Sequence, residues 1–217
     1  MSDKFEKKLD EVYESSGDRQ KLDRAYDKWS QDYDRDLWAS GNPYIALIAA
    51  MAGRYIENRD ARIMDGGCGT GNLGYILKLV GYGNIVGLDA SAGMLEAARA
   101  KNCYVELHQK LLGAVIDLPA ESFDAVTAAG VFTQGHAPPE SLDGLLALAK
   151  PGAPVIFSIS RIAMEEGGFG EKILELDRKG LWVLEEQSEL FRTYPFSARY
   201  ETLRHWISVY RKSDLQT

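Results

Sequence analysis

The sequence predicts an α/β fold, with a doubly wound, mostly parallel sheet and helices on both of its faces. Two apolar runs lead to this prediction, because residues 61–64 and 84–88 are each followed by an acidic residue and then by a helix-like segment. The first run also breaks into a series of glycines between Gly66 and Gly74. Parallel strands need a crossover connection, which is usually a helix, so this alternation favours a parallel sheet.

The glycine series predicts a tight loop between a strand and a helix, at which a ligand approaches the backbone. Glycine allows positive φ and places no side chain between the backbone and the ligand. Asp65 stands just before the loop, and Asn72 begins the helix after it. Asp89 ends the next strand, at the position of the ribose-binding acid of mononucleotide folds. Together these features predict a nucleoside cofactor.

The charge of Asp65 favours one of two kinds of nucleoside cofactor. Residues 69–74 also satisfy the dinucleotide pattern G-x-G-x-x-G, which is a weak signal when it stands alone. A dinucleotide would place an anionic pyrophosphate at the helix N-terminus, where a carboxylate would repel it. S-adenosylmethionine has no phosphate and carries a sulfonium and an ammonium, so Asp65 favours it.

Two motifs resemble those of the class I S-adenosylmethionine-dependent methyltransferases. Asp65-Gly66-Gly67-Cys68-Gly69-Thr70-Gly71 matches their D/E-x-G-x-G-x-G, and Asp89-Ala90-Ser91-Ala92-Gly93-Met94-Leu95 is similar to the D-x-S-x-x-M-L after their second strand. The resemblance covers roughly residues 26–210. It implies a Rossmann-like, seven-stranded sheet with an antiparallel last strand. It also implies cofactor contacts from Asp65, Gly66, Gly67, Gly69, Gly71, Asn72, Asp89, Ala90, Ser91 and Met94.

The first 57 residues predict a helical cap. Apolar residues recur at helical spacing from Phe5 to Tyr13, and the aromatic residues Tyr26, Trp29 and Tyr33 continue that spacing in a second helix. Such a stripe is usually packing, but residues 26–34 resemble the Y-D-x-W-A-x-x-Y-D segment that folds over the cofactor in many small-molecule methyltransferases. By that resemblance Tyr33 contacts the cofactor. We therefore expect a single domain, with a cap at 1–57 and a Rossmann-like core at 58–217.

The loop after the third strand departs from the family pattern. The family usually offers an acidic residue to the adenine amino group, whereas this chain has Gln109, Lys110 and Leu111 there. Either the Gln109 side-chain oxygen or a backbone carbonyl accepts the adenine hydrogen bond, or the alignment is displaced by a few residues.

The loop after the fourth strand holds the candidate catalytic residue. Residues 130–136 lie at the carboxyl edge of the expected sheet, where ligands bind in doubly wound folds. With residues 26–34, they resemble the Williams-Beuren syndrome region methyltransferase-like group, and Gly130 and Val131 are expected to contact the cofactor. His136 is a candidate general base, because an imidazole with an unperturbed pKa near 6.5 can take an acceptor's proton. Alternatively, it caps the loop or contacts the cofactor.

Composition narrows the class of acceptor. The net charge of −7 provides no overall basic field, which favours a small-molecule acceptor over nucleic acid. The signature N/D-P-P-Y of enzymes that methylate adenine or glutamine is missing. Cys68 and Cys103 form neither a disulfide framework nor a zinc pattern, so we expect reduced thiols and no metal. With no signal peptide or membrane span in the sequence, we expect a cytoplasmic monomer or homodimer.

The leading hypothesis is in-line transfer of a methyl group from S-adenosylmethionine to a small molecule, which leaves S-adenosylhomocysteine. One alternative is a module that binds the cofactor with little turnover, as the altered adenine loop allows. An NAD-dependent oxidoreductase is the other, although Asp65 opposes it and no Tyr-x-x-x-Lys set is present. Residues 162–170, rich in glycine, are expected to form a flexible loop beside the substrate pocket.

Overall fold

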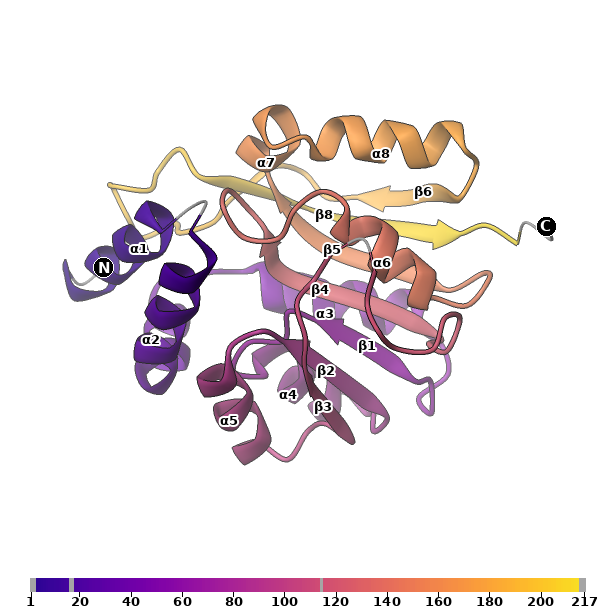
Figure 1. The fold of residues 1–217 in the computed structure, drawn as a ribbon, viewed down its shortest axis with the longest axis horizontal. Coiled ribbons are helices and arrows are strands. Elements are labelled where there is room, and N and C mark those ends of the chain that lie inside the picture. Colours follow the sequence, from indigo (N-terminus) through magenta and orange to yellow (C-terminus); the bar gives the residue numbers. More distant parts are fainter. Residues whose placement is uncertain (1–2, 16–17, 114, 215–217) are drawn as a thin grey trace.

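The protein forms a mixed α/β structure built on one sheet (Figure 1). A computed structural model describes residues 3–15, 18–113 and 115–214 of the chain. Within these ranges the strands are β1 (Ile63–Gly66), β2 (Ile85–Asp89), β3 (Glu106–Gln109), β4 (Ala125–Phe132), β5 (Pro154–Ser160), β6 (Trp182–Gln187), β7 (Phe191–Arg192) and β8 (Arg204–Lys212). The helices are α1 (Asp3–Glu14), α2 (Arg19–Ala39), α3 (Tyr44–Tyr55), α4 (Asn72–Leu79), α5 (Ala92–Ala100), α6 (Ser141–Leu148), α7 (Arg161–Glu166) and α8 (Phe169–Arg178).

The sheet has the expected doubly wound arrangement. Seven strands follow the order β3-β2-β1-β4-β5-β8-β6, in which β8 is antiparallel to both of its neighbours, β5 and β6. In the centre of the sheet Ile63 of β1 lies opposite both Ile85 of β2 and Ala125 of β4, whereas the register of the parallel β4–β5 pair shifts between Ala128 and Phe132. The expected fold class is therefore confirmed. One strand was not expected: the two-residue β7 pairs with β8.

Helices cover the sheet from both sides, because neighbouring residues of the central strands point to opposite faces. Ile63 and Ile85 pack in the hydrophobic cluster that includes α3 and α4, whereas Met64 and Val86 pack in the cluster of α6 to α8. All four residues of β1 are buried. Burial on both faces is typical of a parallel sheet, and it leaves the carboxyl ends of the strands as the place where polar groups meet.

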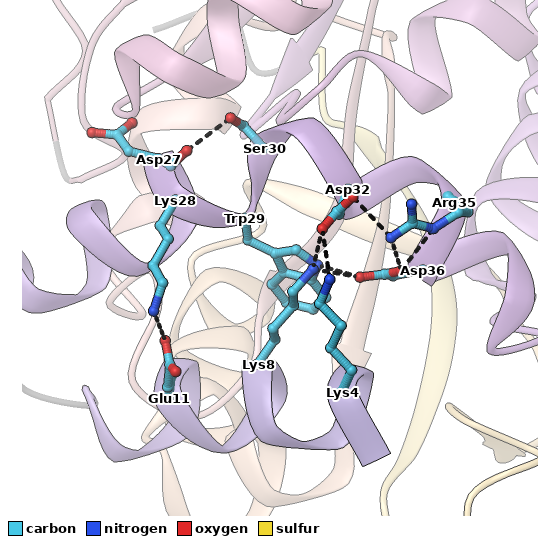
Figure 2. Close-up of polar contacts among 10 residues, drawn as sticks. All are labelled: Lys4, Lys8, Glu11, Asp27, Lys28, Trp29, Ser30, Asp32, Arg35 and Asp36. Carbon is cyan, nitrogen blue, oxygen red and sulfur yellow. Dashed lines mark hydrogen bonds and ion pairs between the residues drawn. The ribbon is translucent and has the colours of Figure 1, made fainter. Parts of the chain in front are cut away.

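The two N-terminal helices lie beyond the carboxyl ends of the parallel strands, on the left of Figure 1. Figure 2 shows how they are joined: Lys8 of α1 pairs with Asp32 and Asp36 of α2 at 2.9 and 2.8 Å, and the Trp29 indole donates to Asp36 at 3.0 Å. Trp29 is itself buried, so α1 and α2 form a packed layer. This layer lies where the sequence predicts a cap.

Residues 162–170 form helices rather than the expected flexible loop. The Ser160 hydroxyl accepts a hydrogen bond from the Ala163 backbone N–H and so caps α7. Gly168, at φ 80°, then begins α8. The glycines in this segment mark the junction of two helices, because glycine reaches positive φ without strain.

Candidate active site

The glycine loop between β1 and α4 turns sharply at the carboxyl edge of the sheet. The backbone N–H groups of Gly67 and Cys68 both donate to the carbonyl of Leu88, which fixes the loop against β2. At Gly67, with φ 71°, a Cβ atom would lie 2.1 Å from the Val131 side chain. At Gly69, with φ 53°, a Cβ would meet no atom within 4 Å. The loop is therefore packed tightly at its base and faces open space at its tip.

Asp65 lies beneath this loop and is fully buried. Its carboxylate accepts hydrogen bonds from the Tyr104 hydroxyl at 2.7 Å and from the Thr127 hydroxyl at 3.4 Å. Burial raises the pKa of Asp65 from 3.8 to about 7, and the nearby Asp89 carboxylate adds to the rise. Asp65 is therefore only partly ionised at neutral pH, whereas the sequence-based argument takes it as a full negative charge at the mouth of the site.

Asp89, at the end of β2, forms hydrogen bonds with both the glycine loop and the loop before α5. One carboxylate oxygen accepts from the backbone N–H of Gly69 at 2.8 Å, and the other accepts from the N–H of Ser91 at 2.9 Å. Each carboxylate oxygen has a second lone pair for another donor, such as a ribose hydroxyl. Ser91 caps α5 by accepting from the Met94 N–H.

Two cavities adjoin the glycine loop. The larger, with about 670 Å³ of empty space, lies between the Asp89 loop and α2. The smaller, with about 330 Å³, reaches Asp65. The larger is lined by these predicted site residues: Tyr33, Gly67, Gly69, Asp89, Ala90, Ser91, Met94, Lys110, Leu111, Gly130, Val131 and His136. The smaller is lined by Asp65 and Asn72, together with Tyr33, Gly67 and Gly69. Gly66, Gly71 and Gln109 line neither cavity, and Gly66 and Gly71 shape the loop backbone instead.

The adenine loop uses its glutamine for a contact inside the protein. The Gln109 amide donates to the Ala90 carbonyl at 3.1 Å, and the side chain is exposed. Lys110 and Leu111 line the larger cavity, and the Lys110 ammonium pairs with Asp117 at 2.8 Å. Of the options that the sequence left open, this arrangement favours a backbone carbonyl of the loop over the Gln109 side chain.

Two aspartates of helix α2, which the sequence analysis did not single out, form hydrogen bonds with the glycine loop and with the loop that follows Asp89. Asp27 accepts hydrogen bonds from the Ser91 hydroxyl and the Gly93 N–H, at 2.6 and 3.0 Å. Asp34 accepts from Thr70 and Asn72, and pairs with Lys101 at 2.6 Å. The signal was present, since each aspartate directly follows a tyrosine and the two pairs are seven residues apart, on one helix face.

A third cavity, which we call the tyrosine chamber, lies between the N-terminal helices and the end of β4. It encloses about 380 Å³. Its lining includes five tyrosines: Tyr13, Tyr26, Tyr33, Tyr44 and Tyr194. Tyr33 lines all three cavities, and Gly130 lines both the chamber and the larger cavity. The chamber therefore adjoins the other two cavities at Tyr33.

His136 lies between the tyrosine chamber and the larger cavity and contacts Tyr26. Its Nε2 is 2.6 Å from the Tyr26 hydroxyl, and its Nδ1 is 3.0 Å from the Gln134 carbonyl. A carbonyl can only accept, so this pairing assigns the proton of the neutral ring to Nδ1 and lets Tyr26 donate to Nε2. The basic lone pair of His136 thus points at the Tyr26 hydroxyl.

The residues present could hold S-adenosylmethionine. The open space at Gly69 admits a ligand against the backbone, Asp89 has lone pairs for ribose hydroxyls, and Asp65 can provide a negative charge for an ammonium group. A phosphate group would lie near two carboxylates, which disfavours a dinucleotide.

Comparison with known proteins finds methyltransferases among the relatives of this chain. A family model described as "Methyltransferase domain" matches residues 63–152. The human "Methyltransferase-like protein 27" is 30% identical over 164 residues, which cover 72% of this chain and 66%, just under two thirds, of that protein. A "Demethylmenaquinone methyltransferase" of Clavibacter sepedonicus is 27% identical over 202 residues, which cover 84% of this chain and 78% of its own.

A solved structure shows the same fold over nearly the whole chain. The magnesium protoporphyrin IX methyltransferase of Synechocystis PCC 6803 with bound SAH superposes with a TM-score of 0.64 at 17% identity. The match covers 95% of this chain and 99% of that one. The motifs at Asp65 and Asp89, the strand order and the related sequences agree. The chain therefore belongs to the class I S-adenosylmethionine-dependent methyltransferase superfamily, the cofactor of which is S-adenosylmethionine.

Proposed function

We propose that this chain transfers a methyl group from S-adenosylmethionine to a small-molecule acceptor held in the tyrosine chamber. The observation that carries the proposal is the meeting of three cavities at Tyr33. The larger cavity at Asp89 is suited to the adenosine part of the cofactor, and the smaller one at Asp65 to its amino acid part. The tyrosine chamber is then left for the acceptor.

The size and position of the chamber support a small acceptor. It holds about 380 Å³ and lies beneath α1 and α2, so a polymer could not enter it as an intact chain. In this proposal the cap expected at residues 1–57 consists of α1 and α2, because α2 closes the site while Asp27 and Asp34 hold it to the two loops. Helix α3 of the same segment packs on the sheet of the core formed by 58–217.

The chain supplies positioning and proton transfer. When bound, the cofactor supplies an activated methyl carbon, so alignment alone provides much of the rate enhancement. Tyr33 and the glycine loop hold the two reactants in adjacent cavities. The Tyr26 hydroxyl, paired with His136, is placed to pass an acceptor's proton to Nε2. We propose His136 as the general base on this geometry.

Calorimetric titration with S-adenosylmethionine, S-adenosylhomocysteine and NADH tests the cofactor assignment. Binding of the two sulfur compounds without NADH supports the proposal, and the reverse would support the oxidoreductase alternative. The acceptor class is tested by incubating the protein with radiolabelled S-adenosylmethionine and a cell extract divided by ultrafiltration. Label that enters only the low-mass fraction is expected. Label in neither fraction, despite tight cofactor binding, would favour a binding module.

Substituting His136 tests its role. We expect His136→Ala to lower kcat by about 100-fold, the lower end of the usual range for general acid–base catalysis, with little change in cofactor affinity. Tyr26→Phe should lower kcat by a smaller factor, because water can replace the missing hydroxyl. If His136→Ala weakened cofactor binding and kcat equally, the residue would be a binding residue and not a base.

A further inference from the structure

Apart from His136, the proposed base, no described residue in the wall of the tyrosine chamber carries a formal charge. Among the described residues that line it, none is aspartate, glutamate, lysine or arginine. Burial raises the pKa of Tyr13 to about 12 and those of Tyr44 and Tyr194 well above 10, so these phenols are neutral at physiological pH. His205 is only 2% exposed, and burial, with a smaller contribution from His136, lowers its pKa to about 3. Its imidazole is therefore neutral as well.

An uncharged wall selects against ionised ligands. A carboxylate or an ammonium that enters the chamber would lose its hydration without gaining an opposite charge, which is strongly unfavourable. Aromatic rings could attract a cation, but the sulfonium of a cofactor bound in the adjoining cavities would itself bring a positive charge near Tyr33 and repel a second cation. A protonated amine also lacks the lone pair that a methyl acceptor needs. The acceptor is therefore uncharged when it binds.

The walls are made largely of aromatic rings. The rings of Tyr26 and Trp29 stack with centroids 6.4 Å apart and 8° between their planes, and Tyr33 meets Trp29 edge to face at 4.9 Å. Flat surfaces of this kind pack best against another planar ring, by stacking or by edge-to-face contact. The shape of the chamber thus favours an aromatic acceptor over a branched aliphatic one.

One polar group in the chamber wall makes no hydrogen bond of good geometry. The hydroxyl of Thr133 is buried, its residue is 6% exposed, and its polar neighbour is the Tyr13 hydroxyl, whose pKa it lowers without forming a well-aligned hydrogen bond. By contrast, the other threonine in the wall, Thr193, has its hydroxyl 2.6 Å from His205 Nδ1. A hydroxyl oxygen can accept two hydrogen bonds and donate one, so the buried Thr133 hydroxyl has capacity for a ligand that forms a well-aligned hydrogen bond with it.

The proton-accepting pair indicates which polar group the acceptor carries. A thioether or another nucleophile without a proton would need no base, whereas a ring hydroxyl keeps its proton at neutral pH, since a phenol has a pKa near 10. Tyr26 and His136 are arranged to receive such a proton.

We propose that the acceptor is an uncharged aromatic compound with a free ring hydroxyl, a phenol, and that Thr133 binds its polar group. This inference rests on the proposed function. In the transfer, an electron pair of the phenol oxygen forms the new bond to the methyl carbon, and the carbon–sulfur bond breaks with its electron pair left on sulfur. The phenol proton passes through the Tyr26 hydroxyl to Nε2 of His136, which later releases it to solvent. The products are a methyl ether and S-adenosylhomocysteine.

Three probes of similar size but different charge test the class. The protein is first saturated with S-adenosylhomocysteine, and calorimetry then measures the binding of 4-ethylphenol, 4-ethylbenzoate and 4-ethylbenzylammonium. We expect 4-ethylphenol to bind at least tenfold more tightly than either ion. Equal or tighter binding of an ion, or no binding of 4-ethylphenol, would overturn the inference about the acceptor and leave the proposed function intact. Failure of S-adenosylhomocysteine to bind would overturn the proposed function instead.

Two matched variants test the role of Thr133. Thr133→Val removes the buried hydroxyl with little change of shape, and we expect it to weaken 4-ethylphenol binding about five- to tenfold. Ser141→Ala removes another buried hydroxyl, at the start of α6 and outside the chamber lining. It should leave this affinity unchanged. If both variants bind 4-ethylphenol as the wild type does, Thr133 does not bind the acceptor.

Discussion

The burial of Asp65 makes a prediction about stability that can be worked out from the structure. A pKa of about 7 in the folded state, against 3.8 for an ordinary aspartate, means that the folded protein opposes ionisation of this side chain. The unfolded chain ionises near pH 4, whereas the folded chain keeps its proton until about pH 7. Between these values the folded state binds more protons, so its stability falls as the pH rises.

The magnitude follows from the two pKa values. Complete ionisation of Asp65 in the folded state destabilises it by about 4 kcal/mol, at 1.36 kcal/mol for each pKa unit. Between pH 5 and pH 8 the change amounts to about 3 kcal/mol. Asp65→Asn keeps the hydrogen bond from Tyr104 and removes the ionisation. We therefore expect the variant to gain about 3 kcal/mol of stability relative to the wild type as the pH rises over this interval.

Urea unfolding of the cofactor-free protein at pH 5 and pH 8 measures this difference. Asp36→Asn is a control, because the pKa of Asp36 is shifted in the opposite direction to that of Asp65. Although burial works the other way, hydrogen bonds from Lys8, Trp29 and Arg35 hold the pKa of Asp36 below 3.8. Asp36→Asn should therefore destabilise the protein by the same amount at both pH values. If the free energy of unfolding of Asp65→Asn differed from that of the wild type by the same amount at pH 5 and at pH 8, Asp65 would have an ordinary pKa in the folded protein. That result would refute the reasoning from burial.

Three further predictions concern the cofactor site. S-adenosylhomocysteine should bind the wild type up to about tenfold more tightly at pH 8 than at pH 6, because the ionised fraction of Asp65 rises from about 0.1 to about 0.9. For Asp65→Asn, calorimetry should give the same Kd at both pH values. Asp89→Ala should weaken this binding by about 1–3 kcal/mol, and an unchanged Kd would exclude Asp89 from ribose binding. Asp34→Asn should speed S-adenosylhomocysteine release at least about fivefold in stopped-flow measurements, since the bonds to the glycine loop weaken. Ser30→Ala, whose hydroxyl bonds only within α2, should release it at the wild-type rate.

The described part of the chain has no helix that is both long and apolar enough to cross a membrane. Cys68 and Cys103 are free and buried, as expected of thiols without a disulfide partner.

The sequence alone predicted the fold class, the glycine loop and the two acidic strand ends. These features are local: a strand that ends on an acid and turns through glycines is written in consecutive residues, and its backbone can form only a few structures. The helices at 162–170 were missed because glycines that separate two helices look the same, in sequence, as glycines of a flexible loop.

Only the tertiary structure decided how charged these groups are and what they contact. Asp65 loses much of its charge because burial removes it from water and the Asp89 carboxylate lies nearby, although hydrogen bonds from Tyr104 and Thr127 act in the opposite direction. Asp89, Tyr104 and Thr127 are all distant from Asp65 in sequence. The tyrosine chamber likewise combines α1, α2, the end of β4 and the segment before β8. Burial and hydrogen bonding depend on such distant segments, so the ionisation of Asp65 and the burial of the Thr133 hydroxyl become apparent only when the chain is folded.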